Sequence, residues 1–242
     1  MSDKRLVWDL PLRAFHWLLV LSLVGLWTTA KADADYMDWF TKHFDVTWMQ
    51  WHFRFGFFVI GLLSFRIIWG FIGPKHARFV NFVPGPAKVI AYLGTVFRRD
   101  SAPSIGHNPL GALMVLVILA LVGLQAYTGL FNSDDVVWDG PYHSAVSSAF
   151  ASRMGAIHQL NYRILLWVVA VHVLAIVFYT VYKRQRLVPP MIHGYKPSAI
   201  VPEHEAIRSS QLLKALIVAL VCAGAVTVLV KMAPEPPEVS YN

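Results

Sequence analysis

The feature that most constrains this chain is a series of five apolar runs, each close to the ~20 residues that a helix needs to cross a lipid bilayer. The runs cover about residues 10–28, 48–72, 110–131, 155–183 and 212–232. The composition agrees, because 56% of the 242 residues are hydrophobic and only 14% are charged. No polar stretch is long enough to form a separate soluble domain. We therefore predict an all-α integral membrane protein with five transmembrane helices.

The first apolar run has a second possible interpretation. Lys4 and Arg5 precede it and a stretch of small residues follows it, which is the pattern of a secretory signal peptide. However, the run contains His16, Trp17 and Trp27, which would make an unusual signal core. We therefore interpret it as the first transmembrane helix, with Asp9 as its N-cap.

The basic residues predict the topology. Of the 21 lysines and arginines, 14 lie in the N-terminal segment, in the loops at 74–109 and 183–210 and at the adjoining helix ends, and 4 lie in the alternate loops and at their helix ends. The positive-inside rule therefore places the N-terminus in the cytoplasm and the C-terminus outside. Within the 74–109 loop, residues 86–98 have the pattern of a short helix lying on the membrane surface. The formal charge of +7 is thus a topology signal, and we expect lipid and not nucleic acid around this protein.

Two histidines in the fourth run point to a function, because ionisable or ligating side chains inside a membrane are costly. His158 and His172 are 14 residues apart. At about 100° and about 1.5 Å per residue, they return to within about 40° of the same helix face, roughly 21 Å apart. One helix therefore offers an imidazole near each side of a hydrocarbon layer about 30 Å thick. Two further histidines, His16 and His52, also lie in apolar runs.

The topology determines which histidines can meet. His16 lies near the cytoplasmic end of the first helix and His172 in the cytoplasmic half of the fourth, so we predict that they bind one haem iron. His52 and His158 lie near the outer ends of the second and fourth helices and are predicted to bind the iron of a second, periplasmic-side haem. A lone histidine near a helix end is more often an interfacial residue, but two pairs at matching depths are harder to explain that way. Two axial imidazoles occupy both free positions of an iron, which favours electron transfer over oxygen binding.

Cysteine usage specifies the type of haem. Cys222 is the single cysteine, and no C-x-x-C-H motif for covalent attachment is present. Any haem is therefore of the b type, without a covalent bond to the chain. The remaining histidines fall in predicted loops, and we assign them no role; they are His43, His76, His107, His143, His193 and His204.

Two arginines are candidates to bind haem propionates. Arg66 lies 14 residues after His52, so it occupies nearly the same face of the second helix at the depth of the cytoplasmic haem. The alternative for Arg66 is a side chain that extends to the cytoplasmic lipid headgroups. Arg13, one turn before His16, is a second candidate on weaker grounds. Arg54 and Arg163, near the outer ends of their helices, fit either the second haem or the interface.

Several of these residues also carry a family resemblance. They are Arg-Ala-Phe-His-Trp around His16, Trp-His-Phe-Arg-Phe-Gly around His52, Gly-His-Asn-Pro-Leu at 106–110, Thr-Gly-Leu-Phe at 128–131, and the spacing of His158 and His172. Over about residues 7–195 the chain resembles the bacterial cytochrome b561 and nickel-hydrogenase b-type cytochrome family. This family includes the b-type subunit of membrane formate dehydrogenase.

The resemblance implies a four-helix bundle that binds two b haems, here residues 1–190, in the bacterial inner membrane. It also implies exchange of electrons between quinone and a periplasmic redox partner, such as a dehydrogenase, a hydrogenase or a cytochrome c. Quinone would react near His16, Arg66 and His172, although no quinone motif is visible. Residues 191–242 form a cytoplasmic linker, a fifth helix and a short periplasmic tail. The fifth helix departs from shorter family members, and contact with a partner subunit is one possible use for it.

Two other functions compete with an electron relay. A stand-alone quinone-linked oxidoreductase, such as a superoxide oxidase, would need basic residues facing its substrate at the outer surface, where this chain is instead acidic. The acidic residues of the outer loops suit a basic protein partner better, and they include Asp33, Asp35, Asp38, Asp45, Asp134, Asp135 and Asp139. A haem-free membrane scaffold or transporter is the third possibility, and the histidine pattern argues against it. We leave open whether the chain is itself an enzyme or the quinone-reactive subunit of an oxidoreductase complex.

Overall fold

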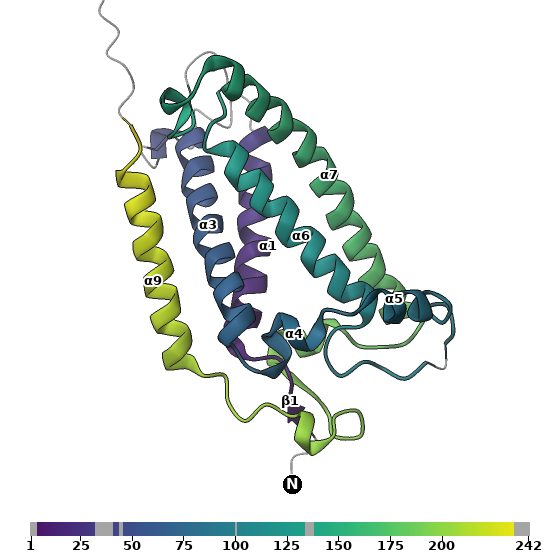
Figure 1. Ribbon diagram of the computed structural model, residues 1–242. Helices are drawn as coiled ribbons and strands as arrows, with labels where there is room; N and C mark the ends of the chain where they lie inside the picture. Colours follow the sequence, from purple (N-terminus) through teal and green to yellow (C-terminus); the bar gives the residue numbers. More distant parts are fainter. Residues whose placement is uncertain (1–3, 32–40, 44–45, 100, 134–137, 235–242) are drawn as a thin grey trace, which may run out of the picture. The chain divides into compact units, whose positions relative to one another are not determined.

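The computed structural model describes residues 4–31, 41–43, 46–99, 101–133 and 138–234. Within these residues, five helices are long and apolar enough to cross a membrane, as predicted (Figure 1). They are α1 (Leu10–Lys31), α3 (Trp48–Ile72), α6 (Pro109–Gly129), α7 (Ser148–Val181) and α9 (Leu212–Lys231). The shorter elements are β1 (Lys4–Leu6), η1 (Lys75–Ala77), α4 (Phe79–Phe82), α5 (Pro86–Leu93), η2 (His143–Ala145), α8 (Val188–His193), β2 (Tyr195–Pro197) and η3 (Glu203–Glu205). The chain is therefore an all-α, multi-pass membrane protein.

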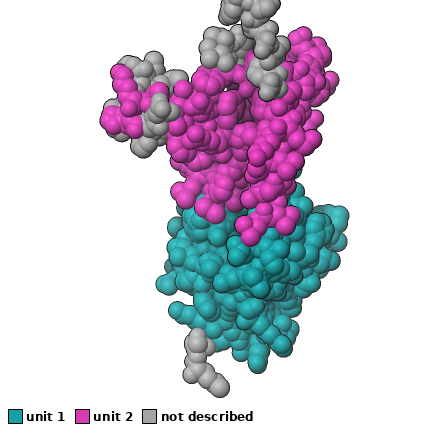
Figure 2. Space-filling model, turned by 90° about the vertical axis from the view of Figure 1, so that its left-hand side faces the viewer, with its two compact units in different colours: residues 1–17, 64–120, 166–219 teal, residues 18–63, 121–165, 220–242 magenta. Residues whose placement is uncertain are grey.

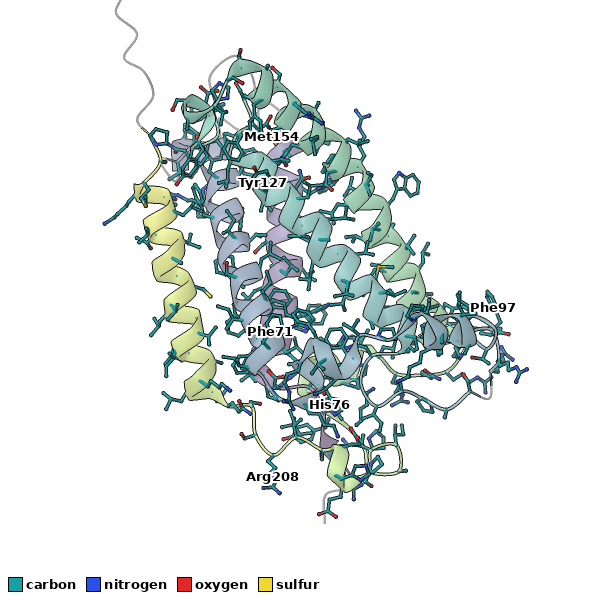
Figure 3. The ribbon with its side chains drawn as sticks, in the orientation of Figure 1. Phe71, His76, Phe97, Tyr127, Met154 and Arg208 are labelled. Carbon is teal, nitrogen blue, oxygen red and sulfur yellow. The ribbon has the colours of Figure 1, made fainter. Side chains whose placement is uncertain are left out.

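Large apolar side chains are exposed along the long helices, and Phe71 on α3, labelled in Figure 3, is 68% exposed. Trp167 on α7 is 76% exposed and Leu213 on α9 is 74% exposed. Apolar patches of this extent are unusual on a soluble monomer, and hydrocarbon around the helices accounts for them. Of the acidic outer-loop residues that we predicted to face a partner, Asp139 lies within the described part of the chain. The others lie outside it: Asp33, Asp35, Asp38, Asp45, Asp134 and Asp135.

The chain divides into two compact units (Figure 2). Unit 1 comprises residues 1–17, 64–120 and 166–219, and unit 2 comprises residues 18–63, 121–165 and 220–242. The boundaries fall inside the long helices, so each of those helices contributes one segment to each unit.

Helix ends differ from the sequence-based bounds where capping, and not apolarity, sets them. The helix α7 begins at Ser148, seven residues before the predicted start, and the Ser147 hydroxyl accepts a hydrogen bond from the backbone N–H of Phe150. The start of α1 was predicted correctly, because Asp9 Oδ1 accepts the N–H of Leu12 at 2.9 Å. The helix α5 ends at Leu93, although the surface helix was predicted to continue to Arg98.

In unit 1, the N-terminal segment is hydrogen-bonded to the segment that precedes α9. The strands β1 and β2 pair antiparallel, with Arg5 opposite Lys196. Gly194 precedes β2 with φ of 91°, and its carbonyl accepts the N–H groups of Val7 and Trp8. Buried basic side chains donate to loop carbonyls: Lys196 Nζ lies 2.9 Å from Ser104 O and 2.7 Å from Ile105 O. The cytoplasmic basic residues predicted from topology thus also hold the loops together.

Unit 2 contains the second half of α9. A Cβ atom added to Gly61 on α3 would lie 3.6 Å from Val226 on α9, which is ordinary van der Waals contact. The Tyr142 hydroxyl donates to the carbonyl of Leu229 at 2.7 Å. The fifth helix therefore packs on the helix that carries His52.

Candidate haem sites

The four predicted ligand histidines fall two to each unit. His16 on α1 and His172 on α7 belong to unit 1, and the two rings interact electrostatically. His52 on α3 and His158 on α7 belong to unit 2 and also interact. This is the grouping that helix spacing and charge bias predict. That each pair ligates an iron stays a prediction.

The two histidines of unit 2 share a hydrogen-bonding arrangement that we had not predicted. Nδ1 of His52 lies 2.9 Å from the hydroxyl oxygen of Thr29, and Nδ1 of His158 lies 3.1 Å from that of Thr128. Both threonines are buried. Threonine is common in helices, so no sequence signal distinguishes these two.

The contacts of each threonine hydroxyl with its own helix indicate which atom donates in these two hydrogen bonds. Thr29 Oγ1 lies 2.7 Å from Gly25 O, and Thr128 Oγ1 lies 2.8 Å from Leu124 O. A carbonyl can only accept, so each hydroxyl hydrogen points to its own helix backbone. The threonine oxygen then accepts from the ring, which places the imidazole proton on Nδ1 and leaves Nε2 with a free lone pair. The backbone carbonyls of Leu26 and Gln125 are second acceptors for the rings of His52 and His158, and they too require a ring donor.

Glycines lie near both rings of unit 2: Gly56 leaves open space after His52, and Gly129 allows the ring of His158 to approach its backbone closely. Gly56 lies one turn after His52, and a Cβ atom added there would meet no heavy atom within 4 Å. A Cβ atom added to Gly129 would lie 3.2 Å from His158 Cε1, which is tighter than ordinary packing. The residues present therefore fit a flat group bound between these helices.

Asn161 ties the helices together near His158. It lies three residues further along α7 and is buried. Its Nδ2 donates to Leu121 O at 2.9 Å and to Gln125 Oε1 at 2.6 Å, both on α6. This side chain therefore fixes the helix of His158 against the helix of Thr128.

Arg66 in unit 1 is only 1% exposed, so it does not extend to lipid headgroups. Its guanidinium carbon lies 4.6 Å from the ring centre of Phe79 and 5.7 Å from that of Phe82. Nη1 and Nη2 are buried and have no hydrogen-bond partner within the described part of the chain. Asp9 attracts Arg66 electrostatically; its Oδ1 accepts from Leu12 N–H and Trp69 Nε1–H, and its Oδ2 is buried without a hydrogen-bond partner among the described residues, so no hydrogen bond joins the two side chains. Buried nitrogens of this kind call for an anionic partner.

His107 is a second, partly buried group beside Arg66, and sequence reasoning missed it. Its ring packs on Trp8 and Phe82 with centroid distances of 4.8 and 4.6 Å. Among the described residues, nothing hydrogen-bonds its buried Nδ1. Burial lowers the pKa of His107 to about 3, with the charge of Arg66 as a further cause, and a carboxylate nearby would oppose that shift. The Gly-His-Asn-Pro-Leu segment that contains it was the available signal.

The other candidate arginines either donate to backbone carbonyls or are exposed to the surroundings of the protein. Arg13 Nε donates to Trp8 O at 3.1 Å, and Arg13 Nη1 donates to Ile192 O. These bonds tie the start of α1 to α8, and a role toward a propionate stays a prediction. Arg54 is exposed, with its guanidinium carbon 5.1 Å from the ring centre of Trp51. Arg163 is also exposed.

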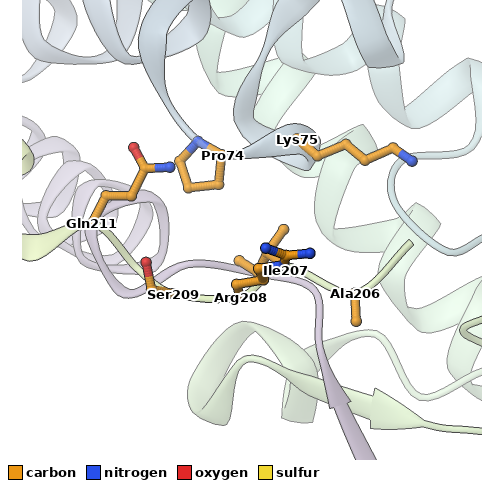
Figure 4. Close-up of a pocket in the computed structure, with 7 residues that line it drawn as sticks. All are labelled: Pro74, Lys75, Ala206, Ile207, Arg208, Ser209 and Gln211. Carbon is orange, nitrogen blue, oxygen red and sulfur yellow. The ribbon is translucent and has the colours of Figure 1, made fainter. Parts of the chain in front are cut away.

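The pocket in Figure 4 lies elsewhere in unit 1, and none of the predicted site residues lines it. Its lining residues are Pro74, Lys75, Ala206, Ile207, Arg208, Ser209 and Gln211. Near it, His76 (labelled in Figure 3) is held by Glu205, whose carbonyl lies 2.8 Å from His76 Nε2. We assign this pocket no role in electron transfer.

The chain is similar in sequence to a known family and to several known proteins. The sequence profile of the prokaryotic cytochrome b561 family matches residues 7–194. A probable Ni/Fe-hydrogenase B-type cytochrome subunit of Azotobacter vinelandii is 27% identical over 214 residues, which cover 78% of this chain and 87% of that protein. Its counterpart from Rhizobium leguminosarum bv. viciae is 24% identical over 209 residues, with the same coverage of both chains. A third, from Cupriavidus necator, is 26% identical over 215 residues, or 78% of this chain and 86% of that protein.

The matched region contains all four candidate histidines, together with Arg66 and His107 of unit 1. The family match and the five apolar helices together indicate a haem protein of the membrane. This chain belongs to the prokaryotic cytochrome b561 family and is a membrane b-type cytochrome of electron transport.

Proposed function

We propose that this cytochrome holds two b haems, each between two histidines, and relays electrons between membrane quinone and a redox protein at the periplasmic face. The observation that carries the proposal is the grouping of four apolar-helix histidines into two pairs, one in each compact unit. A b haem bound at each pair supplies a one-electron Fe(III)/Fe(II) couple. His16 and His172 hold one iron, and His52 and His158 hold the other.

The residues of each unit have separate tasks. In unit 2 the imidazoles present Nε2, because Nδ1 donates to threonine. In unit 1 the buried guanidinium of Arg66 binds a haem propionate, and His107 offers a second polar group beside it. Arg13 is a weaker candidate, since two of its nitrogens already donate to backbone carbonyls.

The charge bias supports an orientation in the bacterial inner membrane with the N-terminus in the cytoplasm and the C-terminus in the periplasm. His16, Arg66 and His172 then lie toward the cytoplasm, and quinone would react near them. Residues 1–190 form the haem-binding core. Residues 191–242 add the linker, the fifth helix and the tail.

A hydrogenase is the partner that the comparisons favour, because the relatives reported above are described as B-type cytochrome subunits of Ni/Fe-hydrogenases. Another periplasmic dehydrogenase or a cytochrome c would use the same outer haem. No observation on the described residues favours a stand-alone superoxide oxidase over this relay.

Haem content and the reduced-minus-oxidised spectrum of the purified protein test the proposal. We expect a b-type spectrum and two haems per chain after expression with ample haem. One haem per chain would contradict the two-site arrangement, and a protein without haem would contradict the function itself.

A further inference from the structure

We propose that Thr29 and Thr128 are positioning residues for the haem of unit 2. Each accepts the Nδ1–H of one axial histidine, which keeps Nε2 toward the iron and increases the electron donation of both imidazoles to it. This inference rests on the proposed function, since it assumes that His52 and His158 are the ligands.

The geometry is the same at both positions. Thr29 on α1 meets His52 on α3, and Thr128 on α6 meets His158 on α7, so each bond joins two different helices. Thr29 is 6% exposed and Thr128 is fully buried, so water does not compete for either hydroxyl. Because each hydroxyl hydrogen is committed to a carbonyl of its own helix, each threonine is held as an acceptor.

Unit 1 offers no equivalent arrangement around its first histidine. Nδ1 of His16 is buried and has no hydrogen-bond partner among the described residues. The effect of the threonines is therefore confined to unit 2. The haem of unit 1 serves as an internal reference in the same molecule.

The consequence for redox chemistry follows from the ligand. A hydrogen bond accepted from Nδ1–H makes a metal-bound imidazole more basic and fixes its orientation. A more basic ligand stabilises Fe(III) relative to Fe(II), so both threonines lower the reduction potential of the unit 2 haem. Removal of either hydroxyl should raise that potential.

The test measures both midpoint potentials and the low-spin ferric electron paramagnetic resonance signals of the full-length protein. We compare Thr29→Val, Thr128→Val and the double variant with Thr29→Ser and Thr128→Ser, which keep the hydroxyl. Ser22→Ala is the matched control, because Ser22 is a buried serine on α1 whose hydroxyl donates to Leu18 O of its own helix at 2.7 Å.

The expected result is an upward shift of one midpoint potential and a changed signal of the same haem, largest in the double valine variant. The serine variants and Ser22→Ala should match the wild type. Loss of only the unit 2 haem in the valine variants, with retention in the serine variants, would support the same role. Unchanged potentials and signals in a double variant that keeps both haems would overturn the inference, as would equal shifts of both haems. If the wild type itself lacked the second haem, the proposed function would fail instead.

Discussion

The guanidinium of Arg66 lies 4.6 Å from the ring centre of Phe79, while both of its terminal nitrogens are buried without a hydrogen-bond partner in the described chain. An aromatic face weakly stabilises a cation but leaves its N–H groups unsatisfied. Burial and unsatisfied N–H groups together indicate that Arg66 binds an anion and does not extend to the membrane surface.

Replacement of Arg66 by leucine should lower the midpoint potential of the unit 1 haem. A positive charge favours the reduced, less positive haem. At about 8 Å and an effective dielectric constant of about 20, one charge contributes ~2 kcal/mol, or about 90 mV for one electron. Redox titration of both haems measures the shift. Arg66→Lys should restore most of the potential, and Arg54→Leu, an exposed change on the same helix, should leave it unchanged. An unaltered titration of Arg66→Leu would mean that Arg66 has no propionate partner.

Replacement of Asn161 by leucine should destabilise the protein by about 1–3 kcal/mol, because it removes both hydrogen bonds from Asn161 Nδ2 to α6 and leaves Gln125 Oε1 without this partner. Thermal unfolding in detergent measures this. Thr227→Val on α9 is the control, since that threonine is exposed and its hydroxyl donates to Ala223 O of its own helix. Equal stability of the two variants would show that Asn161 does not hold α6 and α7 together.

Lys196 should make stability depend on pH. Burial lowers its pKa from 10.5 to about 8. Between these values the unfolded chain binds more protons than the folded chain, so the stability that Lys196 contributes rises as the pH rises and is lost as the pH falls through about 8. From pH 8 to 9.5 the free energy of unfolding should increase by about 2 kcal/mol, at 1.36 kcal/mol per pH unit. Unfolding of the wild type and of Lys196→Met across this range measures it, and parallel curves would contradict the prediction.

The sequence alone was sufficient to predict the five helices and the candidate ligands. Apolar runs near 20 residues long have few alternatives, and imidazoles within them stand out because their burial is costly. The burial of Arg66 was not predictable in the same way, because the lipid-facing and the buried sides of an apolar helix have similar composition.

Contacts between helices distant in the sequence escaped prediction. Thr29 and Thr128 each resemble any other helical threonine until the partner helix is in place. His107 looked like a loop residue because nothing in its local sequence predicts that Trp8 and Phe82 cover it. The early start of α7 at Ser148 was missed because apolarity marks the membrane segment and not the capped end of the helix.

The haem complement of four single variants tests the central claim most directly. His16→Ala, His52→Ala, His158→Ala and His172→Ala are each purified, and the bound haem is counted and assigned by its midpoint potential. We predict that His16→Ala and His172→Ala lose the same haem, and that His52→Ala and His158→Ala lose the other. Loss of different haems within either pair, or of both haems in every variant, would contradict the account.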